Sequence, residues 1–102
     1  MGFLVKLDTN GSNPEMLDLL LSHHLVDYIA MDIKNPFEKY AEVTGRDIDT
    51  DLYKKSIQLI MERAPQYEFR TTLIRHIHSE EDVRDMAESI RGSKQYYLQN
   101  YR

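Results

Sequence analysis

The fold expected for this chain depends on the stretch VDYIAMDIK at residues 26–34, which Asn35 and Pro36 follow. Its apolar and β-branched residues predict a strand over residues 26–33, and the Asn-Pro pair stops that strand. Asp32 and Lys34 share one parity of the strand, whereas the residues between them are apolar. Because side chains alternate across a strand, one face of this strand is polar. A covered parallel strand is usually apolar on both faces, and the polar parity of this strand departs from that rule.

A strand and a helix are predicted before this stretch. Residues 3–8 are apolar and β-branched, and the turn formers TNGSN at residues 9–13 end that strand. Asn13 is a suitable N-cap, and Pro14 fits the first helical position, where its missing N–H is not needed. The apolar residues of this helix form one stripe that runs to about His24: Met16, Leu17, Leu20 and Leu21.

Two further helix and strand pairs are predicted after it. Residues 36–48 form a mixed connection in which Phe37, Tyr40 and Val43 favour a short helical turn. Asp49 or Thr50 then caps a helix that Pro65 ends, and residues 67–74 alternate as a strand. The apolar face of this helix comprises Tyr53, Ile57, Ile60 and Met61.

The last helix begins after Ser79, whose hydroxyl suits the cap, and acidic residues fill its first turn. Gly92 is placed to close it at C′. A Tyr-rich strand is predicted over residues 95–101. The order is therefore β-α-β-α-β-α-β, which indicates an α/β fold with a parallel sheet in one domain, residues 1–102. The alternation by itself leaves both an open sheet and part of a barrel possible.

The other predicted strands also carry polar residues on one parity. If these parities face the same side, the sheet has one charged face. Ligand sites of parallel α/β folds lie at the carboxyl ends of the strands, and buried charges of both signs are costly unless paired or occupied by a ligand. A solvated face and purely structural ion pairs are the alternatives. The polar set comprises Lys6, Asp8, Asp32, Lys34, Glu68, Arg70, Thr72, Gln95 and Gln99.

Composition excludes several classes of protein. Apolar residues make up 41% of the 102 residues and charged residues 29%, which is the balance of a globular protein. The net charge is −4, with lysine and arginine dispersed, so no nucleic-acid partner is expected. No apolar run is long enough to span a membrane and no signal peptide is recognised, so a cytoplasmic location is expected. The chain contains no cysteine, which excludes thiolate-bound metal.

Four blocks resemble strand ends of the glycyl-radical activating enzymes, a group within the radical S-adenosylmethionine (SAM) superfamily. The blocks are KLDTNG at residues 6–11, VDYIAMDIK at 26–34, YEFRTT at 67–72 and LQNY at 98–101. Activating enzymes of anaerobic ribonucleoside-triphosphate reductase and of pyruvate formate-lyase are members of this group. The resemblance implies a (β/α)6 partial TIM-type barrel, of which this chain is the C-terminal half, from the third strand through the sixth.

The resemblance also implies roles for particular residues. Asp32, Lys34 and Arg70, with Ile33 between the first two, match positions that line the SAM site. A monovalent cation beside SAM is implied at Asp8, Thr9, Met31 and Asp32, and hard oxygen ligands of this kind suit such an ion. The residues alone leave two alternatives open, a turn cap for Asp8 and Thr9 and an ion pair between Asp32 and Lys34.

The sequence departs from the family at its chemical centre. The CxxxCxxC motif of the [4Fe–4S] cluster, the Gly-Gly-Glu block and a histidine after the sixth strand are all missing. The complete enzyme would use the cluster and SAM to make a 5′-deoxyadenosyl radical and install a glycyl radical on a partner, of the anaerobic ribonucleotide reductase or pyruvate formate-lyase type. This chain alone is expected to be inactive: it should hold no cluster, and SAM should bind it weakly or not at all.

Three further expectations concern the alternative function, the histidines and the association of the chain. An independent α/β binding or interaction domain without catalysis is the alternative to an enzyme fragment. The pairs His23-His24 and His76-x-His78 are predicted at opposite ends of the sheet, where solvated loop histidines are favoured over a zinc site. The first strand would be an exposed edge, so self-association is expected.

Overall fold

Strands and helices alternate along the chain, so the predicted α/β class is confirmed. The computed structural model describes residues 4–39, 50–74 and 78–100. The elements in chain order are β1 Lys6–Thr9, α1 Pro14–Ser22, β2 Tyr28–Asp32, the 3-10 turn η1 Phe37–Lys39, α3 Thr50–Arg63, β3 Gln66–Leu73, α4 Glu80–Ser89 and β4 Tyr96–Asn100.

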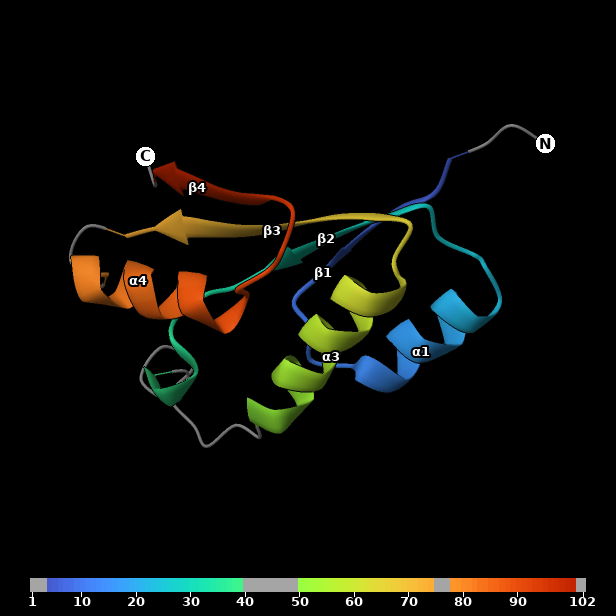
Figure 1. Ribbon diagram of the computed structural model, residues 1–102, viewed down its shortest axis with the longest axis horizontal. Helices are drawn as coiled ribbons and strands as arrows, with labels where there is room; N and C mark the ends of the chain where they lie inside the picture. Colours follow the sequence, from blue (N-terminus) through green and yellow to red (C-terminus); the bar gives the residue numbers. More distant parts are fainter. Residues whose placement is uncertain (1–3, 40–49, 75–77, 101–102) are drawn as a thin grey trace.

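The four strands form one parallel sheet, as predicted, and their order across it is β1-β2-β3-β4. The register places Asp32 beside Arg70 and Arg70 beside Tyr97. Helices α1, α3 and α4 all lie on the same side of this sheet (Figure 1). The opposite face therefore carries no helix from the described segments, and it is called the open face below.

The core lies between the sheet and these helices. Ile29 and Met31 of β2 and Phe69 of β3 are fully buried, and they share the parity opposite to Asp32 and Arg70. Burying a side chain of this size contributes about 1.5–3 kcal/mol, so the apolar parity determines which face the helices cover. The helices contribute Leu17, Leu21, Ile57, Ile60 and Met86 to the same cluster.

The loop between β1 and α1 is fixed to the core at Gly11. Its φ is +79°, and a Cβ at this position would lie 2.2 Å from the Cε atom of Met31. The buried hydroxyl of Ser56 on α3 donates to the Gly11 carbonyl at 2.7 Å. The glycine thus lets the backbone approach β2 closely while it joins the first strand to α3.

Both predicted caps of α1 and α4 are confirmed. The Asn13 side chain accepts from the Met16 N–H at 3.1 Å. Ser79 and Asp82 form a reciprocal capping box, in which each side chain accepts from the other residue's backbone N–H. The Asp82 side chain is only 1% exposed, and Lys39 Nζ lies 2.6 Å from it. The hydrogen bond from Lys39, and next the Ser79 N–H, hold the pKa of Asp82 below its usual value.

Several predicted bounds differ from the observed ones. β1 begins at Lys6, β2 begins at Tyr28, and α4 ends at Ser89. Gly92 has a φ of +92° but lies two residues beyond the C-cap Ile90, so it shapes the following turn instead of occupying C′. The parts of the predictions that fall on Phe3, Tyr40, Val43, Asp49 and Tyr101 lie outside the described residues.

The sheet has two edges within the described segments. β1 pairs with β2 and β4 pairs with β3, and neither has a second partner there. No described helix has the length and apolarity that crossing a membrane requires.

Candidate functional site

The open face of the sheet is polar across all four strands, as the strand parities predict. Each strand contributes one parity to it, because the register pairs like with like. Ala30 is apolar, unlike the polar residues around it on this face, and it is fully buried. The face comprises Lys6 and Asp8 of β1, Tyr28, Ala30 and Asp32 of β2, Gln66, Glu68, Arg70 and Thr72 of β3, and Tyr97 and Gln99 of β4.

Arg70 is the centre of a charge cluster near the carboxyl ends of the strands. Its Nη2 lies 3.2 Å from Asp8 Oδ1, and its Nε lies 3.5 Å from Asp32 Oδ1 and 3.7 Å from Glu68 Oε2. Three carboxylates from three adjacent strands thus surround one guanidinium, which we call the Arg70 cluster. Three carboxylates contact one guanidinium there, so these four side chains carry an excess of negative charge. A further positive group would be attracted to them.

The guanidinium of Arg70 is incompletely hydrogen-bonded. Its Nε is buried and has no hydrogen-bond partner among the described residues, because Asp32 and Glu68 lie at ion-pair distances only. Asp8 and Asp32 remain about half exposed or more, at 67% and 49% of their side-chain surface. Buried polar atoms are normally satisfied, so the orphaned Nε indicates a site that a ligand or water completes.

Tyr28 and Glu68 form a second contact beside the cluster. The Tyr28 hydroxyl donates to Glu68 Oε1 at 2.6 Å, and the ammonium of Lys6 lies 5.4 Å from the centre of the Tyr28 ring. The hydrogen bond to Glu68, followed by burial and the Glu68 charge, raises the pKa of Tyr28 to about 12. Tyr28 is therefore a neutral donor at physiological pH. The strand parity placed both residues on this face, but the sequence assigned neither of them a role.

The backbone after β2 is held by β3. The Ile33 N–H donates to the Arg70 carbonyl at 2.8 Å, and the Thr71 hydroxyl donates to the Ile33 carbonyl at 2.6 Å. The Ile33 side chain is buried in the core, so the predicted site residue Ile33 lies with its side chain on the helix-covered side. Lys34 follows it with an exposed side chain at the carboxyl end of β2.

The four residues of the expected cation site divide between the two faces. Asp8 and Asp32 lie on the open face and contact Arg70, whereas the register pairs Thr9 with Met31 on the other parity. The Thr9 hydroxyl accepts from the Gly11 N–H at 3.0 Å, as a turn cap does. No cluster of three metal-binding side chains from histidine, cysteine, aspartate or glutamate occurs in residues 4–39, 50–74 and 78–100.

The described histidines differ in exposure and in hydrogen bonding. His23 and His24 are exposed at the end of α1, as predicted. His78 is half-buried and hydrogen-bonded through both ring nitrogens, so the expectation of a solvated loop histidine is wrong for it. His76 lies outside the described residues.

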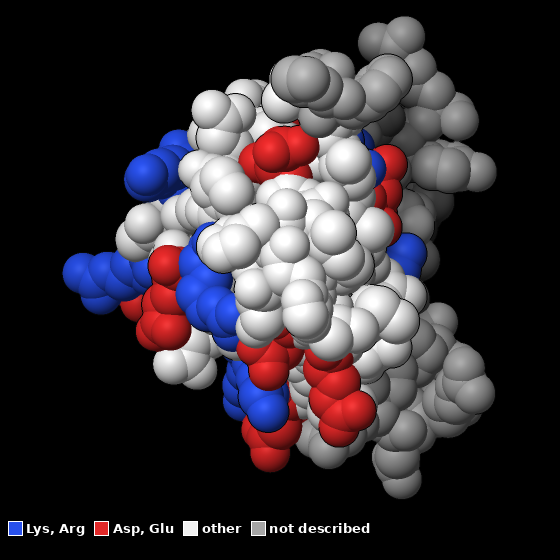
Figure 2. Space-filling model, turned by 90° about the vertical axis from the view of Figure 1, so that its right-hand side faces the viewer, with Lys and Arg blue, Asp and Glu red and all other residues white. Residues whose placement is uncertain are grey.

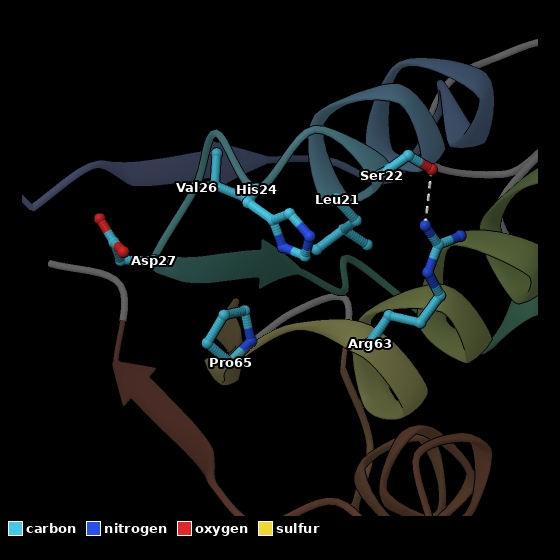
Figure 3. Close-up of a pocket in the computed structure, with 7 residues that line it drawn as sticks. All are labelled: Leu21, Ser22, His24, Val26, Asp27, Arg63 and Pro65. Atoms are coloured by element: carbon cyan, nitrogen blue, oxygen red, sulfur yellow. Dashed lines mark hydrogen bonds between the residues drawn. The ribbon is translucent and has the colours of Figure 1, made fainter.

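A pocket that the sequence did not predict lies at the opposite end of the strands. It has a volume of about 660 Å³, and Figure 3 shows its seven lining residues, Leu21, Ser22, His24, Val26, Asp27, Arg63 and Pro65. Arg63 is already engaged there, because it bonds Ser22 and the carboxylate of Asp18, whose pKa it lowers. Asp27 lies directly before β2, and Asp32 is the last residue of β2. Five residues of extended chain span about 16 Å, so this pocket is separate from the Arg70 cluster.

The surface around this end has mixed charge. Figure 2 faces the side of the molecule where the strands begin, and it shows lysine and arginine interspersed with aspartate and glutamate. The described residues form no basic patch on this face.

Comparison with known proteins identifies a relative. Over 104 aligned residues the chain is 35% identical to a protein of Methanocaldococcus jannaschii whose name places it among the glycyl-radical enzyme activating enzymes. The alignment covers 98% of this chain and 43% of that protein, so the chain spans less than half the length of its relative. No family model and no solved structure matches the chain. The resemblance of the sequence blocks to this group of enzymes is thereby confirmed.

Proposed function

We propose that this chain forms part of the SAM-binding wall of a radical SAM enzyme that installs a glycyl radical on a partner enzyme. The observation that carries the proposal is the Arg70 cluster, in which three strands direct carboxylates to one guanidinium on the open face. The relative in M. jannaschii supports the class of enzyme. Because the chain spans 43% of that relative, the activity is proposed for a longer protein.

The charges of the cluster suit SAM. This ligand carries a positive sulfonium and ammonium, a negative carboxylate and the hydroxyls of a ribose. Carboxylates such as Asp32 match the positive groups and accept from hydroxyls, and Arg70 and Lys34 match the carboxylate. The buried Nε of Arg70, which has no hydrogen-bond partner among the described residues, is a donor available for completion. The role of Ile33 is limited to positioning its neighbours, since its side chain is buried in the core.

A monovalent cation at Asp8, Thr9, Met31 and Asp32 belongs to the same proposal. Arg70 contacts Oδ1 of Asp8 and Oδ1 of Asp32, and each carboxylate has a second oxygen. A small cation would therefore share these two side chains with the guanidinium and reduce the excess of negative charge.

The iron–sulfur cluster does not fit this chain, because it contains no cysteine and therefore no thiolate ligand. In the complete enzyme, a cluster bound outside this chain would act together with SAM to supply the radical chemistry. We assign to this chain only the binding and orientation of SAM and infer that it is inactive alone. A cytoplasmic location and a partner of the anaerobic ribonucleotide reductase or pyruvate formate-lyase type are parts of the proposal.

The architecture proposed for the complete enzyme is the (β/α)6 partial barrel. In an open doubly wound sheet, helices cover both faces, whereas all described helices here cover one face (Figure 1). A barrel places its second face inside, where a polar lining surrounds the ligand near the carboxyl ends of the strands. The charged open face and the unpaired edge of β1 both support this arrangement.

The test is a titration of the isotopically labelled chain with SAM, followed by NMR of the backbone amides at millimolar ligand. We expect weak binding that shifts the amides of residues 32–34 and 70–72. Arg70→Ala should weaken it by about tenfold, because a charge-assisted hydrogen bond contributes about 1.5–3 kcal/mol. Arg84→Ala is the matched control, since Arg84 is 78% exposed on α4 and forms an ion pair with Glu80 one helical turn away.

Two outcomes would contradict the proposal. Equal affinity of Arg70→Ala and Arg84→Ala would remove Arg70 from the site. An unchanged spectrum of the wild-type chain at saturating SAM would favour the alternative, an independent α/β binding domain. Circular dichroism of each variant shows whether the fold is retained.

A further inference from the structure

His78 connects two loops at the carboxyl ends of the strands. Its Nδ1 lies 2.9 Å from the backbone nitrogen of Ile74, at the end of β3. Its Nε2 lies 2.7 Å from the carbonyl oxygen of Lys34, at the end of β2. The imidazole thus spans from the loop after β3 to the loop after β2, across 44 residues of sequence.

The hydrogen-bond partners determine which nitrogen of the neutral ring carries the proton. The Ile74 N–H is a donor, so Nδ1 must accept and carries no proton. The Lys34 carbonyl is an acceptor, so Nε2 must carry the proton and donate it. A neutral imidazole with its proton on Nε2 satisfies both bonds, and the other neutral tautomer satisfies neither.

The bond between His78 and the Lys34 carbonyl helps to fix residues 32–34, the segment that carries the proposed SAM contacts Asp32 and Lys34. The Arg70 carbonyl and the Thr71 hydroxyl hold the two peptide groups of Ile33. The next carbonyl, that of Lys34, is the one that His78 holds. Three backbone groups of the two residues after Asp32 are thereby tied to β3 and its following loop.

We propose that His78 is a positioning residue for Lys34, an inference that rests on the proposed SAM site. A lysine side chain has four methylene groups to order when its ammonium binds a ligand, and a mobile backbone beneath it would add to the entropy lost. By fixing the Lys34 carbonyl, His78 removes the backbone part of that loss before SAM arrives. His78 itself touches no SAM atom in this proposal.

The test compares His78→Asn with the wild-type chain. The Asn side-chain oxygen takes the place of Nδ1 and keeps the bond from Ile74, while its amide is too short to reach Lys34. We expect about fivefold weaker SAM binding in the NMR titration, the equivalent of one net hydrogen bond. The amides of Lys34 and Asn35 should also exchange hydrogen faster. His24→Asn is the control, because His24 lies at the opposite end of the sheet with a φ of 53°, which asparagine tolerates.

A double-mutant cycle separates positioning through Lys34 from a general structural effect. In the background of Lys34→Met, His78→Asn should cost little further affinity, because its effect passes through Lys34. An equal loss in both backgrounds would overturn the inference. So would wild-type affinity in His78→Asn, and the proposed function would then stand if Arg70→Ala still binds weakly.

Absence of SAM binding to the wild-type chain would remove the proposed function and this inference together. The tautomer gives a check that needs neither ligand nor variant. NMR of the imidazole nitrogens at neutral pH should find the proton on Nε2, and a proton on Nδ1 would show that the bridge between the loops is not formed.

Discussion

At the scale of single residues, Gly11 illustrates how one atom constrains the fold. Gly11→Ala adds a Cβ 2.2 Å from Met31 Cε at a φ of +79°, so it combines a backbone penalty with a clash. Gly92→Ala has a similar φ of +92°, but its nearest neighbour, Met61 Cε, is 3.6 Å away. We expect Gly92→Ala to lower the free energy of unfolding by about 1 kcal/mol and Gly11→Ala by about 2–4 kcal/mol.

Urea denaturation of the two variants measures this difference. Equal losses would mean that Met31 moves away without cost, since the φ angles of the two glycines are similar. Met31 fills the core between β2 and the helices, where interiors are close-packed, so we expect the loss at Gly11 to be the larger one.

The residues of the site were predictable in part. The alternation of Asp32 and Lys34 with apolar neighbours placed them on one parity, and the same holds for Arg70. That Arg70 lies among carboxylates of three strands depends on the register, which loop geometry and core packing set and no local pattern encodes. The bridge that His78 forms between two loops was not predictable, because both its partners are backbone groups, which leave no signature in the sequence.

At the scale of elements, the helix starts are determined locally. Asn13 and Ser79 each satisfy a backbone N–H in the first turn of their helices. Asn13→Ala and Ser79→Ala should each lower the free energy of unfolding by about 1 kcal/mol. Ser12→Ala is the control, because Ser12 precedes the cap of α1 and should change stability by a few tenths of a kcal/mol at most. A loss at Ser12 as large as at Asn13 would contradict this assignment of the cap.

The same locality explains which element boundaries were predictable. The start of α1 follows from the cap Asn13 and the proline after it. The start of α4 follows from the cap Ser79 and the acidic residues of the first turn. The end of α4 does not, because Ile90 turns inward to the core at 2% exposure and draws the chain toward β4 before Gly92 is reached. Tertiary packing overrides the glycine signal at that end.

At the scale of the whole molecule, the sheet has one apolar and one charged face. The order of the elements predicts the parallel sheet, and the parities predict its two faces. Barrel closure depends on strands that would pair with the edge of β1, and residues 4–39, 50–74 and 78–100 contain no strand in that position. This is the physical reason why the partial barrel is a proposal, whereas the α/β class is an observation.

The unpaired edge of β1 is expected to make the chain self-associate. Val5 directs both peptide groups toward β2, because its N–H donates to Asp27 Oδ2 at 2.7 Å and its carbonyl accepts from the Asp27 N–H at 2.9 Å. Successive residues of a strand point their peptide groups in opposite directions, so those of Lys6 face the free edge. Unpaired groups of this kind promote pairing with a second chain.

Lys6→Pro and Lys6→Ala form a matched pair for this test. Both remove the ammonium over the Tyr28 ring, but only proline removes the N–H that the edge presents. Light scattering over a range of concentrations should show association of the wild-type chain and of Lys6→Ala, and a predominantly monomeric Lys6→Pro. A wild-type chain that stays monomeric at high concentration contradicts the prediction. Equal association of the two variants instead places the contact elsewhere, with the exposed Leu4 and Leu25 as the next surface to test.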